Sequence, residues 1–138
     1  MSAVRWLGLL IKINAVILMT AFVAVFLPES WMARIHEGIG MGEFPRGPLV
    51  GYLTRTVSGL YGLLGIATWI LATDLRRYWP LVKLWGISCL LGGPIVAVID
   101  WETQMPLYWT MFEGAYVTMM GAAVLLLQAR AAKTLDDA

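Results

Sequence analysis

Residues 81–99 read LVKLWGISCLLGGPIVAVI, an apolar run that lies between Pro80 and Asp100 and contains one charged residue, Lys83. A helix of about 20 mostly apolar residues is long enough to cross the hydrocarbon core of a bilayer. The run lacks the alternation of apolar and polar residues that is typical of a half-buried strand. We therefore predict a transmembrane helix over these residues.

Runs of similar length and composition occur three more times, at about residues 6–27, 49–73 and 107–128. Pro28 follows the first of these runs, and Pro106 precedes the last. The first run could also be a secretory signal, but no small-x-small cleavage site follows it, so we expect a retained helix. The sequence therefore predicts an all-α integral membrane protein, a four-transmembrane-helix bundle in which residues 1–138 form a single membrane domain.

The composition agrees with this class. Of 138 residues, 59% are hydrophobic and 14% are charged, whereas a soluble domain is about 45–50% apolar and about 25% charged. These values exclude a soluble globular domain, a disordered chain and a nucleic-acid binder. The single cysteine, Cys89, excludes an intramolecular disulfide and a cysteine-based zinc site.

Charged residues predict the orientation of the bundle. Cytoplasmic segments of membrane proteins carry an excess of Lys and Arg. One side of the four-span arrangement holds Arg5, Lys12, Arg76, Arg77, Lys83, Arg130 and Lys133, and the other holds Glu29, Arg34, Glu37, Glu43, Arg46, Asp100 and Glu102. We predict that both termini lie in the cytoplasm.

A short helix is expected over residues 29–39, between the first two spans. Pro28 and Glu29 are typical of a helix start. Trp31, Met32, Ile35 and Ile39 then fall on one face at helical spacing. This amphipathic pattern predicts a helix that lies in the outer membrane interface.

Small residues at regular spacing predict close contacts between helices. They are Ser58, Gly59, Gly62 and Gly65 in the second span, and Gly114, Thr118 and Ala122 in the fourth.

Arg55 and Glu113 are the candidate site. By helix rise, each lies roughly 8–9 Å into the membrane from the outer side. A charge at that depth is costly, so we expect the two residues to face each other. They form either a structural ion pair, which we favour, or a site for a proton, an anion or a polar headgroup. Tyr52 and Tyr116 could complete either arrangement with hydroxyl groups.

A metal site has weaker support. His36, Asp100 and Glu102 are the candidates for a divalent-cation site on the outer side, but they have no ligand spacing. A solvated acidic surface is the favoured interpretation. We found no catalytic constellation, and we predict no cofactor and no metal.

The layout resembles small bacterial four-helix membrane proteins of the DoxX-like kind, and in particular an uncharacterised family among them. The similarity covers about residues 12–127 and rests on Leu27-Pro28-Glu29-Ser30-Trp31-Met32, Gly42-Glu43-Phe44-Pro45, Tyr52-Leu53-x-Arg55-x-x-Ser58-x-x-Tyr61, Asp74-x-Arg76-Arg77-Tyr78, Met105-Pro106-Leu107-Tyr108-Trp109 and Glu113-Gly114. The resemblance implies a four-helix fold but no activity. Some DoxX-like proteins accompany quinone-linked sulfur oxidation, but this sequence contains no motif that would imply the same activity.

These observations lead to three functional hypotheses. The first is a non-enzymatic accessory subunit or self-associating protein of the bacterial cytoplasmic membrane, whose partners are lipid and either other membrane subunits or further copies of itself. The alternative is a small transport or binding protein that uses the site of Arg55 and Glu113. The third is a subunit of a redox complex that contacts quinone or pigment.

Overall fold

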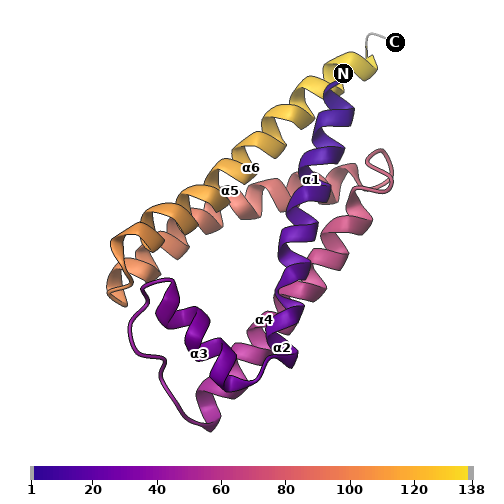
Figure 1. The fold of residues 1–138 in the computed structure, drawn as a ribbon. Helices are drawn as coiled ribbons and strands as arrows, with labels where there is room; N and C mark the ends of the chain where they lie inside the picture. The colour runs from indigo at the N-terminus through magenta and orange to yellow at the C-terminus, as the bar shows by residue number, and fades with distance from the viewer. Residues whose placement is uncertain (1, 137–138) are drawn as a thin grey trace. The chain divides into compact units, whose positions relative to one another are not determined.

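The computed structural model describes residues 2–136, and these form six helices and no strand (Figure 1). The helices are α1 (Ala3–Thr20), α2 (Phe22–Phe26), α3 (Glu29–Gly38), α4 (Pro48–Leu71), α5 (Trp79–Glu102) and α6 (Leu107–Asp136). The predicted all-α fold class is confirmed. The helix expected over 29–39 corresponds to α3, and its position in the membrane interface stays a prediction.

Among the described residues, three stretches are long and apolar enough to cross a bilayer: Ala3–Phe26, which joins α1 and α2, then Trp79–Glu102 and Leu107–Lys133. They correspond to three of the four predicted spans. The helix α4 covers the remaining predicted span and has 24 residues, but it is not among the three. Arg55, several glycines and hydroxyl-bearing residues make it less apolar. The fourth span therefore stays a prediction.

Large apolar side chains cover the outside of these helices. Phe26 is 83% exposed, Phe112 72% and Met119 70%. In water this arrangement would lose the hydrophobic stabilisation that holds soluble domains together. The exposure supports helices that face lipid.

The described chain divides into two compact units, and each is described by itself. The hairpin unit comprises the residues up to Lys12 together with those from Ile70 onward. The central unit comprises Ile13–Trp69.

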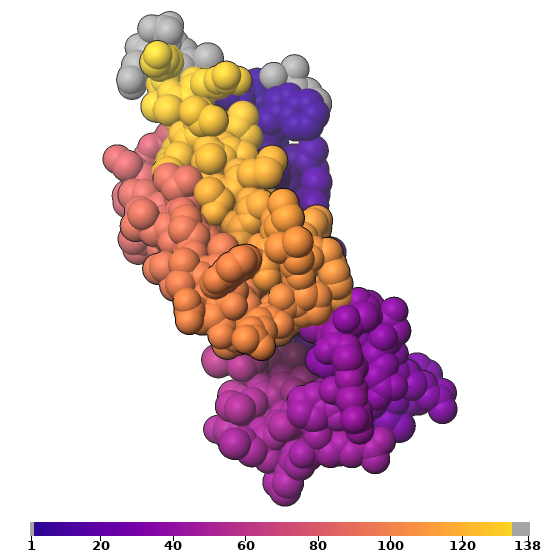
Figure 2. Space-filling model, turned by 90° about the vertical axis from the view of Figure 1, so that its left-hand side faces the viewer, coloured from indigo at the N-terminus to yellow at the C-terminus, as the bar shows by residue number. Residues whose placement is uncertain are grey.

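In the hairpin unit, α5 and α6 lie side by side and run in opposite directions (Figures 1 and 2). Glycines make the close approach possible. A Cβ atom at Gly114 would lie 2.7 Å from the Cβ of Ala97, and one at Gly93 would lie 2.6 Å from the carbonyl oxygen of Gly114. Gly121 is equally close to the backbone of Gly86. The predicted stripe on the last helix is therefore confirmed at Gly114 and Thr118, and Gly121 also meets the α5 backbone. The role of Ala122 stays a prediction.

These contacts define a seam along the two helices. Its members recur at alternating intervals of four and three residues: Gly86, Leu90, Gly93 and Ala97 on α5, and Gly114, Thr118, Gly121 and Leu125 on α6. Asp100 and Gln128 continue these intervals, and the side-chain amide of Gln128 donates a hydrogen bond to the carbonyl oxygen of Trp79 at the start of α5. This spacing is that of a coiled-coil interface.

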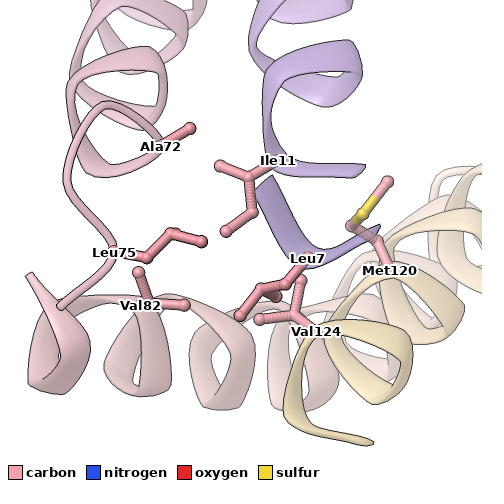
Figure 3. Packing of buried hydrophobic residues seen from close by; sticks show 7 residues of the cluster. All are labelled: Leu7, Ile11, Ala72, Leu75, Val82, Met120 and Val124. Carbon is pink, nitrogen blue, oxygen red and sulfur yellow. The ribbon is translucent and has the colours of Figure 1, made fainter. Parts of the chain in front are cut away.

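A cluster of buried apolar residues ties α1 to this hairpin (Figure 3). Its members come from α1, from the α4–α5 connection, from α5 and from α6, and they are Leu7, Ile11, Ala72, Leu75, Val82, Met120 and Val124. The first turns of α1 are thereby fixed against the α4–α5 connection.

In the central unit, α4 packs closely against the chain that precedes α3. A Cβ atom at Gly65 would lie 2.7 Å from the backbone nitrogen of Met19 and 2.8 Å from the carbonyl oxygen of Ala15. Gly62 is in similarly close contact with the ring of Phe22. Small residues of α4 are thus used for helix packing, as the sequence predicted.

Candidate functional site

Arg55 lies in the second turn of α4 and is partly buried. Its Nη2 donates a hydrogen bond to the carbonyl oxygen of Leu27 (3.2 Å), and its Nη1 donates to the carbonyl oxygen of Gly51 (3.4 Å). Leu27 is the C-cap residue that follows the last residue of α2, and the carbonyls at the end of a helix have no donor within it. The guanidinium therefore caps α2 and holds its end against α4.

The same side chain lines a pocket of about 450 Å³ in the central unit. The other lining residues are Glu29, Gly47, Pro48, Gly51 and Tyr52. Each lies at a helix end or in the first turns of a helix. Gly47 has a φ of 140°, a conformation that other residues rarely adopt, and it lets the chain turn directly into α4 at Pro48.

The pocket carries groups of both charges. Arg55 supplies a cation, Glu29 a carboxylate and Tyr52 a hydroxyl group. A guanidinium has five N–H donors, and the two hydrogen bonds to carbonyl oxygens use two of them. The remaining donors can serve an anionic group, while the carboxylate can accept from a donor on the same molecule.

Glu113 lies on α6, in the hairpin unit. Its Oε2 accepts a hydrogen bond from the indole Nε1 of Trp109, one turn earlier on the same helix. Tyr116, one turn later, stacks on the ring of Phe112 with centroids 6.2 Å apart and an interplanar angle of 11°. Its ring also packs against the buried apolar cluster.

The candidate residues thus fall into two groups. The structure brings Arg55 and Tyr52 to one pocket of the central unit, and it places Glu113 and Tyr116 on α6 in the hairpin unit. The interaction between Arg55 and Glu113 joins two separately described units, so it stays a prediction.

His36 and the acidic residues of the predicted outer side differ in their surroundings. His36 makes an edge-to-face contact with the ring of Phe44, with centroids 5.4 Å apart. Within residues 2–136, no group of three His, Cys, Asp or Glu side chains is placed to hold a metal. Glu102 is exposed, as are Glu37 and Glu43.

Asp100 contradicts the expectation of a solvated acidic surface. Its side chain is only 6% exposed, and its Oδ2 has no hydrogen-bond partner among the described residues. The position follows from the seam, because Asp100 lies one turn beyond Ala97 on the face of α5 that meets α6. It is also close enough to Glu113 for the two carboxyl groups to interact electrostatically.

Two residues of these sites were not recognised from the sequence. From the sequence, Glu29 is expected only to start a helix, and Asp100 is expected on an exposed acidic surface. Asp100 continues the intervals of four and three residues that run through Gly86, Gly93 and Ala97, but only the helix contacts identify that face of α5 as the one that meets α6.

Comparison of the chain with protein-family models, curated proteins and solved structures finds no match. The resemblance to DoxX-like proteins therefore stays a prediction.

Proposed function

We propose that the chain is a non-enzymatic integral membrane protein that works by lateral association, either as an accessory subunit of a membrane complex or as a homo-oligomer. In this proposal α4 is the fourth span, the protein resides in a bacterial cytoplasmic membrane, and both termini lie in the cytoplasm.

The observation that carries the proposal is the contrast between two adjacent glycines of α5. A Cβ at Gly93 would collide with α6, whereas one at Gly92 would have no atom within 4 Å. A glycine inside a helix costs roughly 0.5–1 kcal/mol relative to alanine. No close helix contact within the hairpin unit requires a glycine at Gly92 and offsets that cost.

Gly92 is therefore explained by a helix that approaches α5 from outside the hairpin unit. Small residues are enriched where membrane helices meet, because they let two backbones come close. The exposed Ser88 lies four residues earlier and extends the small surface by one turn. Only 17% of the apolar stretch of α5 is buried, which leaves ample surface for a partner helix.

The geometry of α4 supports its role as a fourth span. Its 24 residues correspond to about 36 Å of helix, which exceeds the thickness of the hydrocarbon core. Gly62, Gly65 and Thr68 are buried on its packed face, while Leu53, Leu60 and Leu63 are exposed. That distribution is suited to lipid on the outside.

The test is to replace Gly92→Leu and measure oligomeric state and co-purifying partners in mild detergent and in nanodiscs. Ala115→Leu is the matched control, because Ala115 is an exposed small residue of α6. We expect Gly92→Leu to abolish association and Ala115→Leu to leave it intact. A wild-type protein that is only monomeric and has no partner contradicts the proposal. So does a variant whose monomer is destabilised while its association is unchanged.

A second candidate function is ligand binding at the Arg55 pocket. It is favoured by the joint placement of Arg55, Glu29 and Tyr52 around one cavity. The opposite charges suit a small polar molecule or lipid headgroup with an anionic group at Arg55.

A double-mutant cycle separates this candidate from a structural ion pair. Arg55→Gln, Glu113→Gln and the double variant are compared by their free energies of unfolding in detergent. Additivity within about 0.5 kcal/mol is expected if Arg55 serves the pocket. A coupling energy of about 1 kcal/mol or more, with rescue in the double variant, would assign Arg55 and Glu113 to each other and refute the binding site.

A further inference from the structure

A second pocket, of about 460 Å³, lies in the hairpin unit between the start of α1 and the α4–α5 connection. Three cationic side chains line it, Arg5 and Lys12 from α1 and Arg76 from the connection, together with one carboxylate, Asp74. The remaining lining residues are apolar or small, apart from Thr73. This concentration of positive charge has no role in the proposed association of helices.

The apolar cluster fixes the two walls of this pocket. Leu7 and Ile11 of α1 are buried against the connection that contains Ala72 and Leu75 (Figure 3). The helical and turn geometry then leaves Arg5, Lys12 and Arg76 exposed around the cavity. The spacing between the walls is set by buried side chains and does not depend on the flexible cations.

Local hydrogen bonds hold the connection in shape. The Oδ1 of Asp74 accepts a hydrogen bond from the backbone N–H of Arg77 (3.0 Å). The hydroxyl group of Thr73 donates to the carbonyl oxygen of Ile70 (2.7 Å). Asp74 therefore already serves the turn through one oxygen.

The two adjacent arginines of the connection have different surroundings. Arg76 lines the pocket. The guanidinium of Arg77 instead lies over the ring of Tyr78, 5.5 Å from its centroid. Arg76 is therefore a pocket residue, and Arg77 is an adjacent arginine outside the pocket that can serve as a control.

We propose that this pocket binds the phosphate group of an anionic phospholipid. Guanidinium and ammonium groups form strong, charge-assisted hydrogen bonds with phosphate oxygens, and basic pockets between membrane helices bind anionic headgroups. Three cations against one carboxylate leave an excess of positive charge that one phosphodiester partly neutralises. Val4 and Leu9 line the same cavity and offer apolar surface to the lipid chains.

The length of the pocket fits a lipid that enters from the membrane surface. Arg5 and Lys12 are seven residues apart on α1, which corresponds to about 10 Å along the helix. Lys12 lies within the apolar stretch Ala3–Phe26, whereas Arg5 is near its beginning. The cations therefore reach from the headgroup level into the membrane, where a free ion has less access than a lipid.

The experiment measures lipid retention by native mass spectrometry, with the full chain released from phosphatidylcholine nanodiscs that contain a minor fraction of phosphatidylglycerol. We expect retained phosphatidylglycerol and no comparable retention of phosphatidylcholine. Arg76→Gln should lower the apparent affinity about fivefold. Asp74→Asn keeps the oxygen acceptor and removes a repelling charge, so it should raise the affinity.

Arg77→Gln is the control, because it removes the same charge from the adjacent position outside the pocket. Thermal unfolding of each variant checks that the fold is kept. An equal loss of retention in Arg76→Gln and Arg77→Gln would reduce the effect to general attraction of a basic surface and overturn the proposal. Displacement of the lipid by millimolar inorganic phosphate would assign the pocket to a free anion instead.

Discussion

Gly93 is required at its position by the α6 backbone. A methyl group there would lie 2.6 Å from both the carbonyl oxygen of Gly114 and the backbone nitrogen of Thr118. Neither atom is the end of a flexible side chain, so the helices would have to separate. At Gly92, in contrast, the hairpin unit leaves room for a side chain.

We expect Gly93→Ala to destabilise the protein by about 1–3 kcal/mol, the usual range for overpacking. Gly92→Ala should be neutral or stabilise the isolated protein by up to about 1 kcal/mol, because alanine favours the helix. Thermal unfolding in detergent measures both. Equal losses of stability in the two variants would contradict the close contact between α5 and α6 at Gly93.

The second prediction at this scale concerns Asp100. A buried carboxylate oxygen without a hydrogen-bond partner is unfavourable. Asp100→Asn removes the charge at nearly constant volume and should stabilise the protein by roughly 1 kcal/mol. Glu102→Gln, which makes the same kind of change at an exposed position two residues later, should stay within about 0.5 kcal/mol of wild type. Denaturant titrations at neutral pH measure the free energies of unfolding of the two variants. If Asp100→Asn destabilises the protein, the Asp100 carboxylate has a favourable interaction, and the prediction is wrong.

At the scale of elements, α3 and α5 end with the same hydrogen-bond pattern but different residues. After α3, Met41 N donates to His36 O and Gly40 N donates to Glu37 O. After α5, Met105 N donates to Asp100 O and Gln104 N donates to Trp101 O. Both are Schellman motifs, which need a left-handed residue. Gly40 has a φ of 81° and Gln104 a φ of 57°.

The left-handed conformation costs a residue other than glycine roughly 1–2 kcal/mol. We therefore expect Gln104→Gly to stabilise the protein by about 0.5–1 kcal/mol and Gly40→Ala to destabilise it by about 1 kcal/mol. Unfolding midpoints of the two variants provide the measurement. A loss of stability in Gln104→Gly would mean that the glutamine side chain makes a contact worth more than the backbone strain.

The helices themselves were predictable because long apolar runs and prolines mark where they lie. Other features were not. The end of α1 at Thr20, before α2 begins at Phe22, occurs inside a continuous apolar run and has no proline to signal it. The partners of Arg55 are backbone carbonyl oxygens, which every residue carries, so no sequence pattern identifies Leu27 as an acceptor. The burial of Asp100 depends on the register of two helices, which becomes visible only when their contacts are known.

For the whole molecule, the number of spans determines where the ends of the chain lie. Four spans place both termini on one side of the membrane, whereas three place them on opposite sides. Basic residues flank both the first and the last span, which favours the same side.

We therefore expect green fluorescent protein to fluoresce when fused to either end, because it folds in the cytoplasm. Alkaline phosphatase, which is active only outside the cytoplasm, should be active when inserted after Gly40. Fluorescence at only one terminus would show an odd number of spans and would exclude α4 as a membrane-crossing helix.

The short connection between α5 and α6 has a consequence for biogenesis. Residues 103–106 form a connection too short to let one helix stay in the aqueous phase while the other inserts into the bilayer. In the proposed topology, in which α5 and α6 both cross the bilayer, we therefore expect the two helices to insert together as a hairpin. Since the proposed topology places the α5–α6 connection on the outer side, the carboxyl groups of Asp100, Glu102 and Glu113 would then be carried into or across the membrane in the same event.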